Sequence, residues 1–317
     1  MGGRHRHSDP PWRCLPFHYY YMVYMSNLSS TLWRILGFYA LMVSGALLYI
    51  HTSKSELYPT ESVEWYLDLE WYLPNDGVAG LTLMILASWI MIRWVDRRPF
   101  ASLGISVHRH TPWLFAFGLA LGVAMQSIAL YTIGYWQAGM VPEWPIFVII
   151  HPNWDGLVEM VQVLIFVAVA EEVFYRGYAF QAILQRLGTV PGLLIISLLF
   201  GIAHILARPD QPAYVVTTAI GGLFNGILII RTGCLWTAIA AHWGVNLVGD
   251  EIGLLSRGTS DFDPVMWGFD NPQYWPIFGL MTLIIMFVPL PIDRKGKILW
   301  ERYVRRPSWP PWRASTN

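Results

Sequence analysis

Two adjacent glutamates, Glu171 and Glu172, and an arginine, Arg176, interrupt a long apolar run that begins at Val161. Inserting an ionised side chain at the centre of a membrane-spanning helix costs about 2.5–3.5 kcal/mol, so such groups usually mark a functional site. Glu172 and Arg176 are four residues apart, share one helix face and can neutralise each other. Glu171 points about 100° away on an α-helix and lacks an obvious local partner. We therefore expect chemistry at Glu171.

Further polar residues occur in other apolar segments. His204 follows the aromatic residue Phe200 by four positions, and Asn246 follows His242 by four positions, so each pair shares a helix face. Asn225 lies in the glycine-rich run Gly-Gly-Leu-Phe-Asn-Gly. A single histidine or asparagine inside a membrane is often an interhelical hydrogen-bonding group, and we interpret Asn225 in that way. The combination of Glu171 with His204, His242 and Asn246 favours a shared site.

The spacing predicts how these groups meet. Residues 188–192, Gly-Thr-Val-Pro-Gly, form a helix break, with Glu171 17 residues before Gly188 and His204 16 residues after it. An antiparallel hairpin would bring the two side chains to the same depth. The short connection at residues 231–234 predicts a second hairpin, in which His242 lies about 12 Å from the turn. His242 would then lie nearer the cytoplasmic side than His204. Irregular or tilted helices would be needed to bring the two histidines to the same depth.

Composition predicts the elements that position these residues. Of the 317 residues, 55% are hydrophobic and 13% are charged, whereas soluble domains carry about 25% charged residues. The zero net charge argues against a nucleic-acid partner. Cys14 and Cys234 have no metal-ligand spacing and suggest no disulfide framework. We predict an all-α, polytopic membrane helical bundle of about eight transmembrane helices, at Leu32–Ile50, Val78–Val95, Trp113–Gln137, Leu157–Gln181, Gly192–Ala207, Ala213–Ile230, Leu235–Val248 and Trp275–Pro289.

Positive charge predicts the orientation of the bundle in the cell membrane. Arginines and lysines gather at alternate loops and at both ends of the chain, whereas the other loops are acidic or neutral, so both termini are predicted to be cytoplasmic. We divide the chain into a cytoplasmic segment at residues 1–30, a transmembrane bundle at 31–292 and a basic tail at 293–317, where contact with anionic lipid is expected. The natural start is either Met1 or Met25. The basic residues near the span ends include Arg34, Arg93, Arg97, Arg109, Arg186 and Arg231.

Three motifs in this order resemble a known family. Residues 171–176 read Glu-Glu-Val-Phe-Tyr-Arg, residues 200–204 read Phe-x-x-x-His, and residues 242–246 read His-x-x-x-Asn. This pattern is similar to that of the CAAX-protease and bacteriocin-processing (CPBP, Abi) family of intramembrane glutamic endopeptidases. The resemblance covers residues 157–250. A single Glu-Glu-x-x-x-Arg would be weak, but three motifs in three separate spans are specific.

The resemblance implies a role for each motif residue. Glu171 would be the general base that activates a water molecule, with His204 helping to hold it. His242 and Asn246 would donate hydrogen bonds to the oxyanion of a tetrahedral intermediate. The remaining motif residues would support them: Glu172 and Arg176 would brace the helix, and Phe200 would pack beneath His204. The substrate would be a membrane-associated protein or peptide, such as a CAAX protein or a bacteriocin precursor, and no cofactor is expected.

Other functions stay open from the residues alone. Glu171, His204 and His242 could ligate zinc, although no His-Glu-x-x-His motif is present. A proton-coupled transporter also uses buried Glu, Arg and His, but it predicts repeat symmetry that the two halves of the chain do not show. The third alternative is a catalytically silent membrane immunity or scaffold protein, against which the intact motifs argue.

Overall fold

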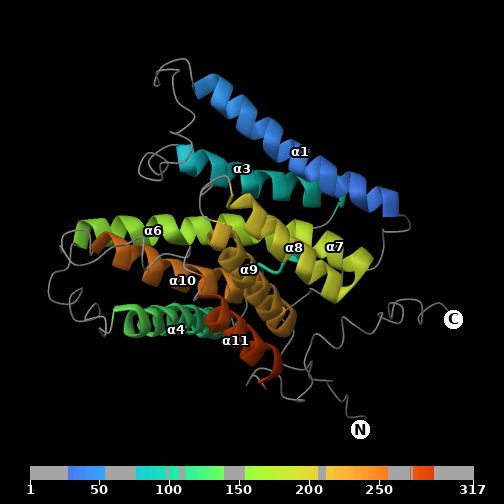
Figure 1. Ribbon diagram of the computed structural model, residues 1–317. Coiled ribbons are helices and arrows are strands. Elements are labelled where there is room, and N and C mark those ends of the chain that lie inside the picture. The colour runs from blue at the N-terminus through green and yellow to red at the C-terminus, as the bar shows by residue number, and fades with distance from the viewer. Residues whose placement is uncertain are drawn as a thin grey trace, which may run out of the picture.

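The computed structural model describes residues 28–53, 76–97, 100–105, 107, 111–138, 154–205, 212–255, 272 and 274–288. Every regular element within these ranges is a helix, which confirms the all-helical prediction (Figure 1). The α-helices are α1 Leu28–Ser53, α3 Asp76–Ile90, α4 Thr111–Ala138, α6 Trp154–Glu171, α7 Phe180–Leu187, α8 Thr189–Ala203, α9 Pro212–Thr232, α10 Leu235–Leu255 and α11 Tyr274–Phe287.

Three shorter helices complete the described part of the chain, and two of them have π-type hydrogen bonding. The π-helix η2 covers Met91–Val95 and continues α3, and the π-helix η4 covers Glu172–Ala179 between α6 and α7. A single 3-10 turn, η3, covers Phe100–Leu103. Each predicted span overlaps a helix, but the fourth is a composite of α6, η4 and α7 rather than one regular α-helix.

Two helices in the described part of the chain are long and apolar enough to cross a membrane, at Thr111–Thr132 and Pro212–Thr232. Shorter apolar helices lie at residues 32–42, 80–95, 189–203 and 274–287. Length and composition thus support membrane helices in the bundle. The number of eight spans stays a prediction.

The long helices α4, α6 and α10 lie side by side, with α1 and α3 on one flank and α9 and α11 beside α10 and α4 (Figure 1). The contact between α4 and α10 is close because glycines replace side chains there. A Cβ atom on Gly122 would lie 2.0 Å from the carbonyl oxygen of Ala241, and one on Gly244 would lie 2.7 Å from that of Leu119. This close packing fixes the position of α10, which carries His242.

The two predicted helix connections are tight, but the first is shorter than its sequence suggests. Gly188 alone separates α7 from α8, with φ of 87°, a conformation that glycine adopts without steric cost. Pro191 lies in the first turn of α8, where a missing N–H leaves no intrahelical bond unmade. Gly233, with φ of 66°, separates α9 from α10.

Arg231 lies in the last turn of α9 rather than in a loop, and its side chain is buried. Its Nη1 atom donates a hydrogen bond to the carbonyl oxygen of Ile285, near the end of α11. The arginine therefore joins α9 to α11. It does not belong with the exposed basic residues that we used to predict the orientation.

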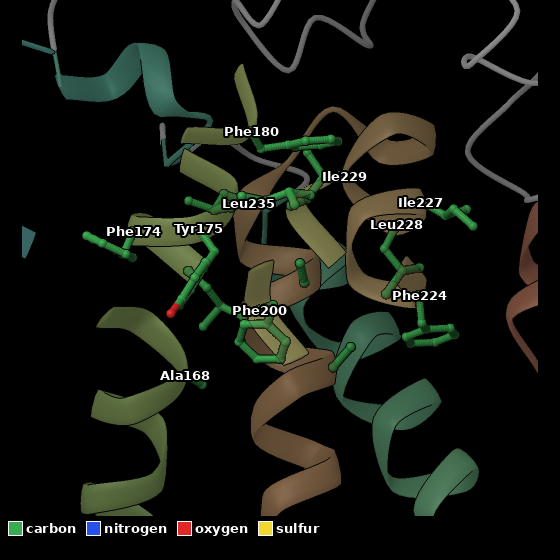
Figure 2. Packing of buried hydrophobic residues seen from close by; sticks show 14 of the residues in the cluster. Ala168, Phe174, Tyr175, Phe180, Phe200, Phe224, Ile227, Leu228, Ile229 and Leu235 are labelled. Carbon is green, nitrogen blue, oxygen red and sulfur yellow. The ribbon is translucent and has the colours of Figure 1, made fainter. Parts of the chain in front are cut away.

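The apolar core surrounds η4 (Figure 2). From α1, Phe38 stacks on Phe174 with ring centroids 4.4 Å apart, and the ring of Tyr178 lies 5.0 Å from the ring of Phe38. From α3, the buried Ser88 hydroxyl donates to the carbonyl oxygen of Val173 at 3.5 Å and to that of Met84 at 2.9 Å. Helices outside the motif region thus hold the polar segment in place.

Candidate active site

The segment η4 carries most of the first motif in a π-helix. All its residues are buried, and its end is marked by the Phe180 N–H, which bonds to the carbonyl of Tyr175, five residues earlier. Hydrogen bonding over five residues is rare and often occurs at functional sites. The sequence predicts α-helical geometry for residues 171–176, with an angle of about 100° between Glu171 and Glu172. Residues 172–179 are instead π-helical.

Glu172 is the centre of a hydrogen-bond network and is fully buried. Its Oε1 atom accepts hydrogen bonds from Arg176 Nη1, Asn225 Nδ2 and His242 Nδ1, each at 3.0 Å. The donors come from η4, α9 and α10, so one carboxylate oxygen ties three helices together. The predicted Glu172–Arg176 pair is confirmed. A carboxylate with three donors is well suited to staying ionised in a dry environment.

Arg176 occupies a slot beside an aromatic ring and a glycine. Its Cζ atom lies 3.9 Å from the ring centroid of Phe200, a cation–π contact. A Cβ atom on Gly222 would lie 2.9 Å from Arg176 Nη2. The guanidinium Nε and Nη2 atoms are enclosed and have no described hydrogen-bond partner. Phe200 therefore supplies much of the stabilisation on that side of the cation.

Phe200 also contacts both motif histidines. Its ring lies 4.6 Å from the His204 ring and 6.0 Å from the His242 ring, both edge-to-face. The predicted packing of Phe200 against His204 is confirmed. His204 Nδ1 lies 2.7 Å from the carbonyl oxygen of Phe200. Because a carbonyl oxygen only accepts, Nδ1 carries the proton and Nε2 is the free ring nitrogen of neutral His204.

His242 lies between the two glutamates. Its Nδ1 donates to Glu172, and its Nε2 lies 3.8 Å from Glu171 Oε2. The Glu171 side chain keeps 17% of its exposure, whereas that of Glu172 keeps none. Glu171 Oε2 is enclosed and has no described hydrogen-bond partner. Glu172 Oε2 also lacks a described partner, so Glu171 is distinguished by its partial exposure and by the absence of a hydrogen bond to either described oxygen.

The predicted pairing of Glu171 with His204 is only partly visible. Tyr175 and Phe200 face each other across the hairpin with ring centroids 5.0 Å apart. Glu171 precedes Tyr175 by one turn and His204 follows Phe200 by one turn, so the antiparallel helices bring both to the same level. No direct hydrogen bond between Glu171 and His204 occurs among the described contacts. The His204 ring instead lies 5.7 Å from that of Tyr214 on α9.

The two asparagines make different contacts. Asn246 lies half-buried on α10, one turn beyond His242, and the described contacts include no hydrogen bond to its side chain. Asn225, which we interpreted as an interhelical hydrogen-bonding residue, has that role but makes its bond to Glu172 at the centre of the site. Its position in an apolar helix was the available signal. The sequence could not show which helix it would contact.

Metal ligation requires several converging side chains. Within the described residues, no three His, Cys, Asp or Glu side chains are grouped as a metal site would need. His204 Nδ1 is occupied by a backbone carbonyl, and His242 Nδ1 is occupied by Glu172. A metal-free site stays a prediction that a chelator can test.

Residues 152–248 match the family model described as type II CAAX prenyl endopeptidase Rce1-like. This segment is similar to the Rce1-like family. The match confirms the resemblance to the CAAX-protease family that the three motifs indicated, although it covers less than a third of the 317 residues. No curated protein and no solved structure matches the chain.

The Rce1-like segment contains α6, η4, α7, α8 and α9 in full and ends within α10. It therefore includes every motif residue from Glu171 to Asn246. The match supports a membrane-embedded protein and an enzyme of the peptidase class. Helices α1, α3, α4 and α11 lie outside the matched segment, yet they pack against it.

Proposed function

We propose that the protein is an intramembrane endopeptidase in which Glu171 activates a water molecule. One observation carries this proposal: Glu171 Oε2 is enclosed, unbonded and 3.8 Å from His242 Nε2, next to a glutamate whose charge is already paired. The motif therefore holds one structural carboxylate and one that is available for proton transfer. A carboxylate with no hydrogen bond to the described residues can bind and deprotonate water.

The proposed reaction uses groups of this chain only. Glu171 takes a proton from water, and the resulting hydroxide oxygen attacks the carbonyl carbon of the scissile peptide bond. The carbonyl oxygen becomes an oxyanion, to which His242 and Asn246 donate hydrogen bonds. Glu171 then returns the proton to the leaving nitrogen as the carbon–nitrogen bond breaks. His204, whose Nε2 is free in the neutral ring, accepts a hydrogen bond from the water and orients it.

The hydrogen bond from His242 to Glu172 constrains this mechanism. Because Nδ1 carries the proton shared with Glu172, the neutral ring has an unprotonated Nε2, which cannot donate to an oxyanion. The oxyanion role therefore requires the imidazolium form of His242.

We further propose that the substrate is a membrane-associated protein or peptide, with CAAX-type proteins as the first candidates because the matched family is named for them. Bacteriocin-like precursors are the second candidates. Comparative terminal proteomics of membranes that contain the wild type or Glu171→Gln tests the activity. New peptide termini that disappear in the variant are expected. If no terminus differs across several growth states, the peptidase function is wrong.

We also propose eight spans with both termini in the cytoplasm. Three highly exposed tryptophans support a membrane–water interface at these helix ends: Trp33 is 72% exposed, Trp94 is 70% exposed and Trp113 is 77% exposed. They lie at the start of α1, in η2 and at the start of α4, which are the helix ends assigned to the cytoplasmic side. Tryptophan favours the membrane–water interface. Labelling of single cysteines at the two termini from each side of sealed vesicles tests the proposal, and labelling of a terminus from the outside would contradict it.

A further inference from the structure

A second polar site lies at the end of α3, outside the Rce1-like segment. It is a cleft of about 540 Å³, lined by Trp89, Arg93, Trp94 and Arg97. The apolar stretch of this helix ends at Val95, so the cleft lies at the level where the hydrocarbon of the membrane gives way to headgroups. None of these residues takes part in the proposed peptidase reaction.

The π-helix η2 creates the cleft. In an α-helix, residues five apart point about 140° away from each other. Hydrogen bonding over five residues puts more residues in each turn, so the directions of residues five apart differ by less, and the Asp96 N–H accordingly bonds to the carbonyl of Met91 at 2.9 Å. Trp89 and Trp94 therefore meet edge-to-face, with ring centroids 6.4 Å apart. The π turn thus builds an indole wall that an α-helix would not form.

The backbone at Arg97 extends the cleft beyond the helix. Arg97 has φ of 54°, the left-handed conformation that non-glycine residues rarely adopt, and it is the one described non-glycine residue that does so. Such strain is retained mainly where a side chain has to be placed for function. The conformation ends the helix and leaves Arg97 exposed beside Arg93.

The charge of the cleft is positive and unbalanced. No acidic residue lines it, and the neighbouring Asp96 pairs with Arg34 from α1 at 2.8 Å. Arg93 and Arg97 are exposed, and neither forms an ion pair with another residue in the described part of the chain. Two guanidinium groups beside two indole rings therefore present an open anion-binding surface with an apolar wall.

We propose that this cleft binds the phosphate headgroup of an anionic phospholipid. Guanidinium groups bind phosphate oxygens in a two-pronged geometry, and indole rings pack against the glycerol and upper acyl region. Free phosphate shares the charge but would leave the indole wall uncovered, with Trp89 41% exposed and Trp94 70% exposed. A phospholipid covers both parts of the cleft, and the observations favour it for this reason.

Native mass spectrometry of the full chain, purified in detergent and titrated with phosphatidylglycerol, tests the proposal. Each basic group near an anionic headgroup contributes about fivefold in affinity, so the double variant Arg93→Gln/Arg97→Gln should bind about thirtyfold more weakly. Trp94→Leu should also weaken binding. Trp113→Leu is the matched control, because Trp113 is equally exposed but lies on α4 and does not line the cleft; its affinity should equal that of the wild type.

Two further titrations decide between ligands. Phosphatidylcholine should bind at least tenfold more weakly than phosphatidylglycerol, and inorganic phosphate at the same concentration should not displace the bound lipid. Equal phosphatidylglycerol affinities for the double variant and the wild type would overturn the proposal. Displacement by inorganic phosphate would overturn it too, because the cleft would then be a simple anion site.

Discussion

The two π-helical segments use the same backbone geometry in opposite surroundings. In η4 every residue is buried, and the Arg176 cation is held by a carboxylate at 3.0 Å and an aromatic ring at 3.9 Å. In η2, Arg93 and Trp94 are exposed and face a cleft. Both segments bring arginine and aromatic side chains together. Burial requires such groups to bind one another, whereas exposure leaves them open to a ligand.

The two segments are neighbours through α3. Ser88 bonds to the carbonyl of Val173 in η4, and the next residue, Trp89, lines the cleft at η2. This closeness makes the comparison testable, because changes at one segment should leave the other intact if their roles are separate. The effects expected below run from the largest to the smallest.

Glu171→Gln should reduce peptide hydrolysis by about 10³-fold or more, because general base catalysis alone contributes on the order of 10²–10⁴-fold and the base here also generates the nucleophile. His204→Ala and His242→Ala should abolish activity as well. Glu171 Oε2 has no described hydrogen-bond partner, so the glutamine variant should fold with wild-type stability. Cleavage of a prenylated CAAX peptide by purified protein measures the first effect. Substantial activity in Glu171→Gln would assign the chemistry to another residue.

Arg176→Ala should lower stability by about 3 kcal/mol or more, because it leaves the buried Glu172 charge without its cation and leaves Phe200 without its stacking partner. Arg93→Ala is the matched control at the exposed π-helix and should change stability by less than about 0.5 kcal/mol. Thermal unfolding in detergent measures both. Equal stability of the two variants would show that the buried Arg176 contributes no more to stability than the exposed Arg93.

Asn246→Ala should lower the turnover rate by about 10²-fold and leave a residual activity, since one remaining donor still stabilises the oxyanion. Its side chain makes no described hydrogen bond within the protein, so melting temperature should not change. Steady-state kinetics with the same CAAX peptide separates the turnover rate from the Michaelis constant. Complete loss of activity, or unfolding of the variant, would contradict an oxyanion role.

Removal of metal should have no effect. Prolonged treatment with EDTA or phenanthroline should leave hydrolysis unchanged, and elemental analysis should find less than one metal ion per chain, because no three His, Cys, Asp or Glu side chains are grouped as a metal site within the described residues. Phosphatidylglycerol binding at the η2 cleft should be equally insensitive. Activity that disappears with the chelator and returns with zinc would make Glu171, His204 and His242 ligands instead.

The sequence by itself determined the helices, the two tight turns and the main ion pair. Apolar runs predict helices because backbone groups in a membrane must be bonded within the segment, and glycines mark turns because only they adopt positive φ freely. The i, i+4 spacing of Glu172 and Arg176 predicts their contact because helix geometry is local. The three motifs also identified the family before any contact was known, since each lies in its own span.

Tertiary packing alone decided the π-helices and the partners of the polar groups. The choice between hydrogen bonding over four or five residues depends on neighbours such as Phe38 and Ser88, which come from distant parts of the chain. The reach of His242 to both glutamates depends on the close approach of α10 to α4 at Gly122. Asn225 joins the site from α9, whose Gly222 lies against Arg176 and Phe200. Such contacts arise between segments far apart in sequence, so residue spacing along one helix carries no record of them.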